Sequence, residues 1–274
     1  MTSFIRLTDF SKQELLAIFK IADSIEQYEG FLKRKTVVMF FPASSIRTRV
    51  TFEKGIYLLG GQVILFDPGT LDKKENIVDV CGYLNNWADV VVVRHSDIHL
   101  LEKMRDALKV PIINAMTDDN HPCEMMSDLY TLSKIRSDYL QDKYLFVGAD
   151  GNIGRAWKEA SKAFDFSLSQ CCPEKNRTED VHYYSELQEA VLGKDIICTD
   201  SIPSSAVEDF KPYQITSKIM ALANKDAVLN PCPPFYRGEE VSEEVIDSKY
   251  FVGYGFKESL LVVQQAIMVY CMTH

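Results

Sequence analysis

The chain has little that would suit a secreted, membrane-spanning or nucleic-acid-binding protein. Its seven cysteines are odd in number and include no Cys-x-x-Cys pair, so neither a disulfide framework nor a zinc site is indicated. No basic-then-apolar segment opens the sequence, and no apolar run approaches the ~20 residues needed to cross a bilayer. Lysine and arginine total 30 against 39 acidic residues, which argues against a general phosphate-binding surface. These absences predict a cytoplasmic protein in which any anionic ligand is bound by a local cationic pocket.

Apolar strands alternate with amphipathic helices along the 274 residues, and a hydrophobic content of 46% is ample for a core. Such alternation predicts parallel sheets covered by helices on both faces. Eight strands suit one large sheet or two smaller ones, and we favour two, divided near the helix predicted at 123–137. The predicted strands are 36–41, 62–66, 90–93, 111–114, 144–147, 195–199, 227–229 and 251–252. The predicted helices are 12–28, 52–59, 77–87, 98–108, 123–137, 152–164 and 257–272.

A phosphate site is predicted where the first strand meets the following helix. Residues 44–49 read Ser-Ser-Ile-Arg-Thr-Arg and bring hydroxyl groups together with two guanidinium groups. A helix N-terminus presents free backbone N–H groups and a positive dipole end, and an arginine fork matches phosphate oxygens. The alternative is a solvated turn whose arginines form ordinary surface ion pairs.

Two further clusters lie at strand ends. Arg94 follows four consecutive valines and so stands at the carboxyl edge of a parallel sheet, where such folds bind ligands. His121 opens a helix and could donate to a carbonyl oxygen, while Glu124, one turn on, could accept from an amine. The alternatives are a strand-end salt bridge for Arg94 and simple helix capping by Asn120 and Glu124.

Two loops are the remaining candidate ligand-binding segments. Gly148, Gly151 and Gly154 follow a strand and open a helix, which suits a nucleotide-binding turn or merely close helix packing. Residues 230–234 contain three prolines and form a stiff loop. Cys232 within it has no base at a defined spacing, so a nucleophilic role is disfavoured.

The order of these clusters resembles the aspartate/ornithine carbamoyltransferase family over nearly the whole chain. Residues 45–49 look like the family's Ser-Thr-Arg-Thr-Arg phosphate loop, and Arg94 falls at its strand-end arginine. Residues 121–124 and 128–131 resemble the family's His-Pro-x-Gln and Asp-Leu-x-Thr motifs, and residues 230–233 lie where its His-x-x-Pro loop belongs. Residues 73–76 resemble its Lys-Gly-Glu-Ser/Thr segment, which in the family reaches a neighbouring subunit's active site.

The resemblance implies an α/β fold with two doubly wound parallel-sheet domains flanking a cleft and a C-terminal helix packing back on the first domain. The expected divisions are a carbamoyl-phosphate-binding domain at 1–124, an amino-acid-binding domain at 125–256 and the returning helix at 257–274. It further implies a homotrimer or multiple of trimers with shared active sites, no metal and no organic cofactor. The implied activity is carbamoyl transfer in arginine metabolism.

The resemblance also assigns residues. Arg94, His121 and Arg47 are expected to be catalytic. Arg94 and His121 would polarise the carbamoyl oxygen and Arg47 would hold the phosphate, without a covalent intermediate. The residues expected to bind carbamoyl phosphate are Ser45, Ile46, Arg47, Thr48, Lys73, Arg94, His121, Glu124, Cys232 and Pro233. Those expected to bind the amino acid are Asn152, Arg155, Asp200 and Arg237.

Three positions depart from the family pattern: Ile46 replaces threonine, Glu124 replaces glutamine and Asn230 replaces histidine. The family's Ser-Met-Gly acceptor loop has no counterpart in residues 201–206. Asp200 suits an ammonium and Arg155 suits a carboxylate, so ornithine or a close relative is the favoured acceptor. The alternatives are aspartate or another amine, a non-catalytic paralogue that binds an anion or partner, and a dinucleotide-dependent oxidoreductase.

Overall fold

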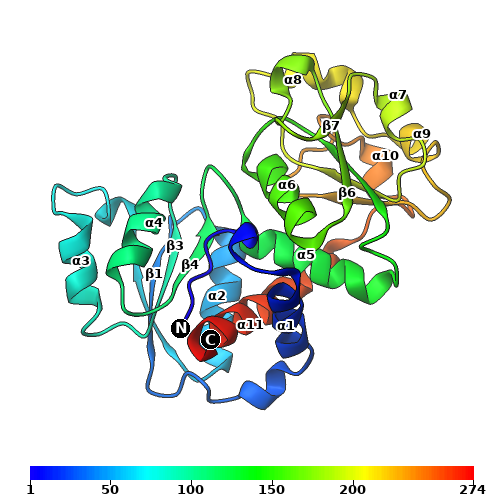
Figure 1. Ribbon diagram of the computed structural model, residues 1–274. Coiled ribbons are helices and arrows are strands. Elements are labelled where there is room, and N and C mark those ends of the chain that lie inside the picture. The colour runs from blue at the N-terminus through cyan, green and yellow to red at the C-terminus, as the bar shows by residue number, and fades with distance from the viewer. The chain divides into compact units, whose positions relative to one another are not determined.

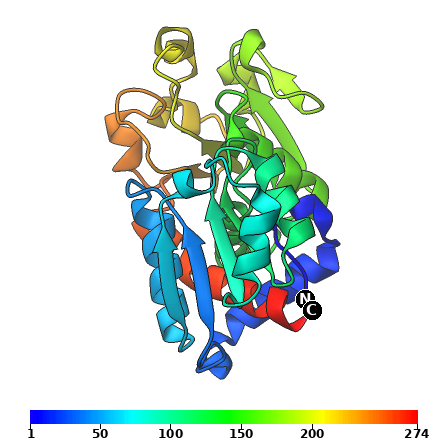
Figure 2. The same cartoon turned by 90° about the vertical axis from the view of Figure 1, so that its left-hand side faces the viewer.

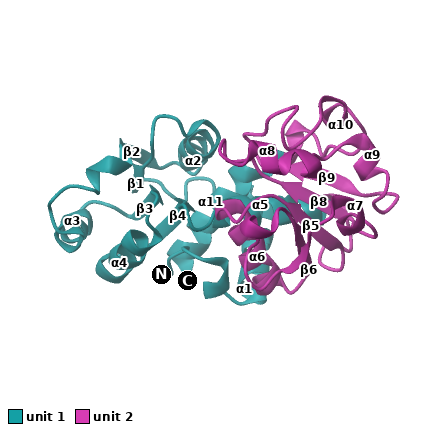
Figure 3. Ribbon diagram, turned by 90° about the horizontal axis from the view of Figure 1, so that it is seen from above, with its two compact units in different colours: residues 1–134, 257–274 teal, residues 135–256 magenta.

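The computed structural model describes residues 1–274 (Figure 1). The chain forms two compact units, residues 1–134 with 257–274 and residues 135–256 (Figure 3). Helix α5 (Pro122–Ile135) runs without a break through residue 124. The units divide at 134/135, one residue before the end of this helix, and the expected domain boundary at 124/125 stays a prediction.

The first unit is built on a parallel sheet with strand order β2-β1-β3-β4. Its strands are β1 (Thr36–Phe40), β2 (Gln62–Phe66), β3 (Val90–Arg94) and β4 (Ile112–Met116). Its other helices are α1 (Lys12–Asp23), α2 (Ile46–Leu58), α3 (Ile77–Leu84), α4 (Ile98–Ala107) and α11 (Ser259–Thr273).

Helices cover both faces of this first sheet. On one face, Cys81 of α3 and Leu101 of α4 pack with Val91 of β3 in a buried apolar cluster. On the other side α11 lies beside α1 and α2 (Figure 2), and Gln265 Nε2 donates to the carbonyl of Gly55 at 3.1 Å. The prediction that the C-terminal helix returns to the first unit is confirmed.

The second unit carries a parallel sheet with strand order β7-β6-β5-β8-β9. Its strands are β5 (Lys143–Val147), β6 (Ser167–Cys171), β7 (His182–Tyr184), β8 (Ile196–Thr199) and β9 (Val228–Pro231). Its helices are α6 (Asn152–Phe164), α7 (Leu187–Ala190), α8 (Val207–Phe210), α9 (Ser217–Met220) and α10 (Glu243–Ile246). The prediction of two doubly wound parallel sheets is confirmed.

Some predicted elements differ from the structure. The strands β6 and β7 were not expected, and residues 251–252 form only a single bridge, from Phe251 to Leu229. Helix α2 begins at Ile46, so the predicted phosphate turn is the first turn of a helix. None of the helices combines the length and the apolar character that a membrane-spanning helix requires.

Candidate functional site

The strand order of the first sheet brings two of the predicted clusters together. The order reverses between β1 and β3, and ligands of open α/β sheets bind beside the carboxyl ends of the strands at such a reversal. Strand β1 leads into Ser45 and α2, while β3 ends at Arg94. Arg94 Nη1 donates to Ser45 Oγ at 3.0 Å, so segments 49 residues apart in sequence meet at the reversal.

The N-terminus of α2 is arranged to receive an anion. Ser45 stands at the N-cap position, yet its side chain does not cap the helix, and the first turn carries no acidic residue. The backbone N–H groups of such a turn have no partner within the helix, and the helix dipole favours negative charge there. Ser45 and Thr48 are buried, whereas Arg47 is exposed. Ile46 is 71% exposed, so its apolar side chain faces solvent.

Arg94 and Arg47 form no ion pair within the protein. Arg49, the neighbouring arginine of α2, instead has its Nε 2.6 Å from Glu53 Oε1. Burial, followed by the nearby charge of Arg47, lowers the pKa of Arg94, although Glu124 opposes this effect. Two cations close enough to repel each other are typical of a site that binds a multivalent anion. This arrangement disfavours the strand-end salt bridge considered for Arg94.

His121 lies at the start of α5 after a loop fixed by side-chain hydrogen bonds. Asn114 Nδ2 donates to Asn120 Oδ1 at 2.7 Å, and the backbone N–H of Asn120 donates to Thr117 Oγ1 at 3.1 Å. The imidazole is buried and its Nδ1 has no hydrogen-bond partner. Burial lowers the pKa of His121 to about 4, with Arg94 and Lys257 adding to the effect and Glu124 opposing it. His121 is therefore a neutral imidazole at pH 7, with one ring nitrogen available to a ligand.

Glu124 is held by a lysine that the sequence had not singled out. Lys257 Nζ lies 2.7 Å from Glu124 Oε1 and 2.5 Å from Asp128 Oδ1. Burial raises the pKa of Glu124, but its surroundings, with the charge and the hydrogen bond of Lys257 foremost, more than offset this effect, so the pKa lies below its ordinary value. Lys257 and Asp128 are thus additions to the predicted set. The sequence feature that could have pointed to Lys257 is its place as a charged residue at the start of a helix that is expected to return to the first unit.

The second sheet has its own reversal, between β5 and β8, and three predicted acceptor residues lie there. Asn152 and Arg155 lie in the first turn of α6 after β5, and Asp200 follows β8. Arg155 Nε lies 3.1 Å from Asp150 Oδ1. The first turn of α6 has no side-chain cap and no acidic residue.

Packing explains two of the three glycines of this turn, Gly148 and Gly154. A Cβ at Gly148 would lie 2.7 Å from the Phe146 ring, and one at Gly154 would lie 2.9 Å from the same ring. The aromatic side chain therefore accounts for glycine at these two positions without a dinucleotide, whereas the space around Gly151 does not require glycine.

The proline-rich loop follows β9, which contains the buried Asn230. Cys232 is buried and Pro233 is partly exposed. The backbone N–H of Tyr236 donates to Glu240 Oε1 at 2.5 Å, which anchors the loop. Arg237 Nη2 lies 3.0 Å from Asp247 Oδ1, so an ion pair already engages this predicted acceptor residue.

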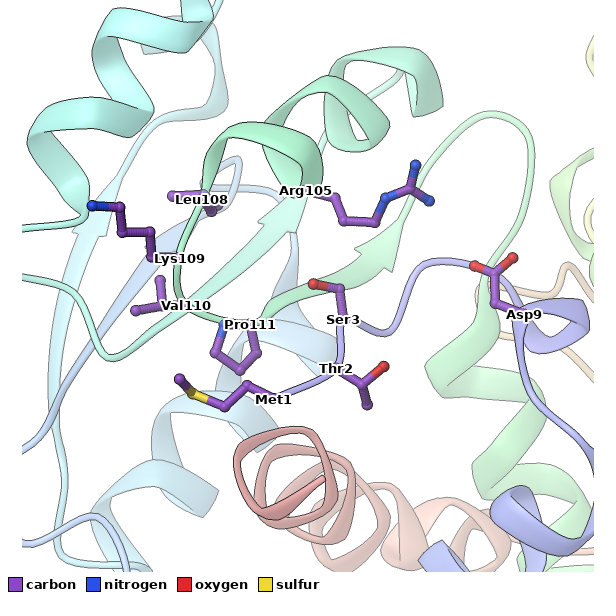
Figure 4. Close-up of a pocket in the computed structure, with 9 residues that line it drawn as sticks. All are labelled: Met1, Thr2, Ser3, Asp9, Arg105, Leu108, Lys109, Val110 and Pro111. Carbon is purple, nitrogen blue, oxygen red and sulfur yellow. The ribbon is translucent and has the colours of Figure 1, made fainter.

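Other features of the first unit give less support for a ligand-binding site. Lys73 lies exposed in the connection before α3. A cavity of about 490 Å³ adjoins Pro111 at the amino end of β4, and it is lined by none of the predicted residues. Figure 4 shows that Arg105 and Lys109 in this cavity point in different directions, so they do not converge on a common ligand. No group of three or more His, Cys, Asp or Glu side chains is arranged to hold a metal.

Both parts of the chain match domain models of one protein family. Residues 2–134 match the family model of the aspartate/ornithine carbamoyltransferase carbamoyl-P binding domain, and residues 141–271 match the Asp/Orn binding domain. An ornithine carbamoyltransferase of Hydrogenovibrio crunogenus is 34% identical over 98% of this chain and 97% of its own. One of Mesorhizobium japonicum is 33% identical over 88% of this chain and 86% of its own.

Solved structures give the same result. The ornithine carbamoyltransferase of Pyrococcus furiosus is 25% identical, covers 99% of this chain and 97% of its own, and superposes with a TM-score of 0.94. The anabolic enzyme of Campylobacter jejuni is 26% identical over 99% of each chain, with a TM-score of 0.91. With both family domains matched in order along the sequence, the chain belongs to the aspartate/ornithine carbamoyltransferase family.

Proposed function

We propose that the protein transfers the carbamoyl group of carbamoyl phosphate to an amine of an amino acid, releasing phosphate and a ureido product. The favoured acceptor is ornithine or a close relative, which would give citrulline or its homologue. The observation that carries the proposal is the pair of arginines, Arg47 and Arg94, without ion-pair partners at an uncapped helix N-terminus.

The phosphate of the donor would bind at the first turn of α2. Its oxygens would accept from backbone N–H groups, from the hydroxyls of Ser45 and Thr48, and from the Arg47 guanidinium. Ile46 has no hydroxyl, and its backbone N–H already donates to the Ser44 carbonyl at 3.0 Å, so the hydrogen bond that a threonine hydroxyl would add, worth about 1 kcal/mol, is absent. Lys73 of a neighbouring subunit would add a further cation.

The carbamoyl carbon would be activated by polarisation of its oxygen. As the amine attacks, negative charge develops on that oxygen, and Arg94 and neutral His121 would donate hydrogen bonds to it. Collapse of the tetrahedral intermediate breaks the C–O bond to phosphate, which leaves with its electron pair, and the attacking nitrogen gives its proton to the departing phosphate. Positioning and electrostatics account for the rate, without a covalent enzyme intermediate.

The acceptor would bind to the second unit. Asp200 provides an anion for an ammonium group, and Asn152 and Arg155 at the start of α6 provide donors for a carboxylate. The relatives named ornithine carbamoyltransferase support ornithine over aspartate. Roles for Cys232, Pro233 and Arg237 belong to the same proposal.

A homotrimer or a multiple of trimers is also proposed. Strand β2 lies at the edge of its sheet and exposes Ile64 and Phe66, and α2 beside it exposes Val50 and Tyr57. An apolar edge of this kind favours association with another chain. Assembly there would also bring Lys73 of one subunit to another subunit's donor site. We further propose that the protein acts in the cytoplasm.

The proposal is tested by colorimetric detection of ureido product from carbamoyl phosphate and a panel of amines that includes ornithine, lysine, putrescine and aspartate. We expect product with ornithine or a near homologue and its loss in Arg47→Ala. Arg49→Ala is the matched control, because Arg49 lies on the same helix but is paired with Glu53.

Each competing function predicts its own outcome, in this assay or in a separate fluorescence titration. Product with aspartate alone would replace the favoured acceptor by the alternative one. Absence of product with every amine at high enzyme concentration would refute the proposal and favour a non-catalytic anion-binding protein. Saturable NAD(P)H fluorescence on mixing would support the oxidoreductase.

A further inference from the structure

We propose that Lys257 is a positioning residue that holds Glu124 as a carboxylate acceptor for the donor's amino group, so that the site selects a carbamoyl donor over its methyl isostere, acetyl phosphate. The inference rests on the proposed function and deepens it. It concerns the residue of this chain, Glu124, at which the family pattern has an uncharged glutamine.

The geometry links two segments 133 residues apart in sequence. Glu124 and Asp128 lie one turn apart on α5, so their side chains extend from the same face of the helix. Lys257, just before α11, reaches both: its Nζ is 2.7 Å from Glu124 Oε1 and 2.5 Å from Asp128 Oδ1. The Glu124 and Asp128 side chains are 7% and 2% exposed, so both carboxylates are almost completely removed from water.

Charge explains why a lysine is needed at this place. Two buried carboxylates one turn apart repel each other, and without a cation one of them would take up a proton. A protonated Glu124 would carry an O–H and would donate where an acceptor is required. The ammonium of Lys257, shared between the two, keeps Glu124 ionised. The other charged or titratable groups facing Glu124 are His121, Arg47 and Arg94.

The bond to Lys257 leaves part of the carboxylate for a ligand. Lys257 binds Oε1, and the protein forms no other side-chain hydrogen bond to Glu124. Oε2 can therefore accept an N–H from a carbamoyl group polarised by the neighbouring His121. A hydrogen bond to an ionised acceptor is about twice as strong as one between neutral groups. A methyl group at the same place would leave the buried oxygen without a donor, and sites built around such a bond reject analogues that lack it by up to about 10⁴-fold.

A double-mutant cycle of Lys257 and Glu124 tests whether Lys257 acts on carbamoyl phosphate binding through Glu124. We expect Lys257→Met to weaken carbamoyl phosphate binding by at least about 10-fold, since Glu124 loses its ionised form. In the Glu124→Gln background the same change should cost less than about 3-fold, because an amide needs no counter-ion. Lys257→Arg should restore most of the binding, since arginine keeps the charge. Inorganic phosphate, which has no amino group, should bind all of these variants within about 3-fold of the wild type, as expected for phosphate contacts made elsewhere.

The experiment is isothermal titration of the full-length wild type and variants with carbamoyl phosphate, acetyl phosphate and inorganic phosphate at pH 6 and pH 8. The loss in Lys257→Met should be greater at pH 6, where Glu124 is more readily protonated. Equal losses in both Glu124 backgrounds, or equal weakening of inorganic phosphate, would mean a purely structural role and overturn the inference. If the wild type binds acetyl phosphate as tightly as carbamoyl phosphate, the selectivity is absent.

The same titrations separate this inference from the proposed function. A wild type that binds neither acyl phosphate refutes both. Normal carbamoyl phosphate binding without product from any amine refutes only the proposed transfer. Normal turnover without coupling between Lys257 and Glu124 refutes only the inference.

Discussion

Glu240 provides a direct test of the electrostatics of the second unit. Its carboxyl group is 2% exposed, with Oε1 accepting from the backbone N–H of Tyr236 and Oε2 buried without a partner. Burial raises its pKa from the ordinary 4.5 to about 7, with Glu239 and Asp200 adding to the effect. The folded chain therefore favours the protonated form. The stability that this form contributes is fully present below pH 4.5 and is lost as the pH rises through 7.

Replacing Glu240 by glutamine should remove this pH dependence. A pKa difference between 4.5 and about 7 is worth about 3 kcal/mol of unfolding free energy at ~1.4 kcal/mol per unit. Glutamine keeps an oxygen for the Tyr236 N–H but does not ionise. We expect Glu240→Gln to be more stable than the wild type by about 2 to 3 kcal/mol at pH 8 and to be close to it at pH 5.

Urea unfolding can be followed in the second unit by fluorescence of the buried Trp157. The chain contains two tryptophans, and the other, Trp87, is 66% exposed in the first unit, so a Trp87→Phe background isolates the signal. Glu179→Gln, an exposed carboxylate of the same unit, is the control and should change little at either pH. An equal effect of Glu240→Gln at pH 5 and pH 8 would refute the reasoning.

Three further predictions concern the first unit. Ile46→Thr should tighten carbamoyl phosphate binding by about 5-fold through one added hydroxyl donor. The control Val50→Thr, one turn further along α2, should not change the binding. If calorimetric titration finds no difference between the two variants, the phosphate does not bind at the first turn of α2. The pKa of His121 is lowered from 6.5 to about 4, so its contribution to stability is present above pH 6.5 and lost as the pH falls through 4. Thermal unfolding should show this loss in the wild type and less of it in His121→Gln; parallel curves would count against a buried neutral imidazole. Phe66→Lys should dissociate the assembly in light-scattering measurements, whereas Gln62→Lys on the same edge strand should not; an intact assembly in both variants would place the interface elsewhere.

The general architecture could be predicted because its strands are apolar. Strands β1 and β3 are almost wholly Val, Met and Phe, and periodicity identifies such strands readily. Strand β6 was missed because it reads Ser-Leu-Ser-Gln-Cys. Its buried polar side chains are satisfied by distant partners: Gln170 Nε2 donates to the Gly148 carbonyl, and Ser169 Oγ accepts from Lys194. Such compensation cannot be seen in a local pattern.

The candidate site was predictable to a similar degree. Arg47, Arg94 and His121 follow strands or open helices, so they are expected to lie at the carboxyl edge of the sheet. Lys257 could not be found in this way, because its partners are 129 and 133 residues distant and only the packing of the last helix brings them together. The sequence also could not show which arginines form ion pairs within the protein, since nothing in it distinguishes Arg49 from Arg94.

The return of α11 to the first unit has a consequence for the order of synthesis. Residues 135–256 are complete before the ribosome reaches residue 257, whereas the unit that begins at the N-terminus still lacks its closing helix at that moment. Domains commonly fold as units while the chain is being made. Here the later-encoded unit is the first to be available in full. The proposed anion site, with the contact of Lys257 to Glu124, becomes complete only after residues 257–274 have been translated.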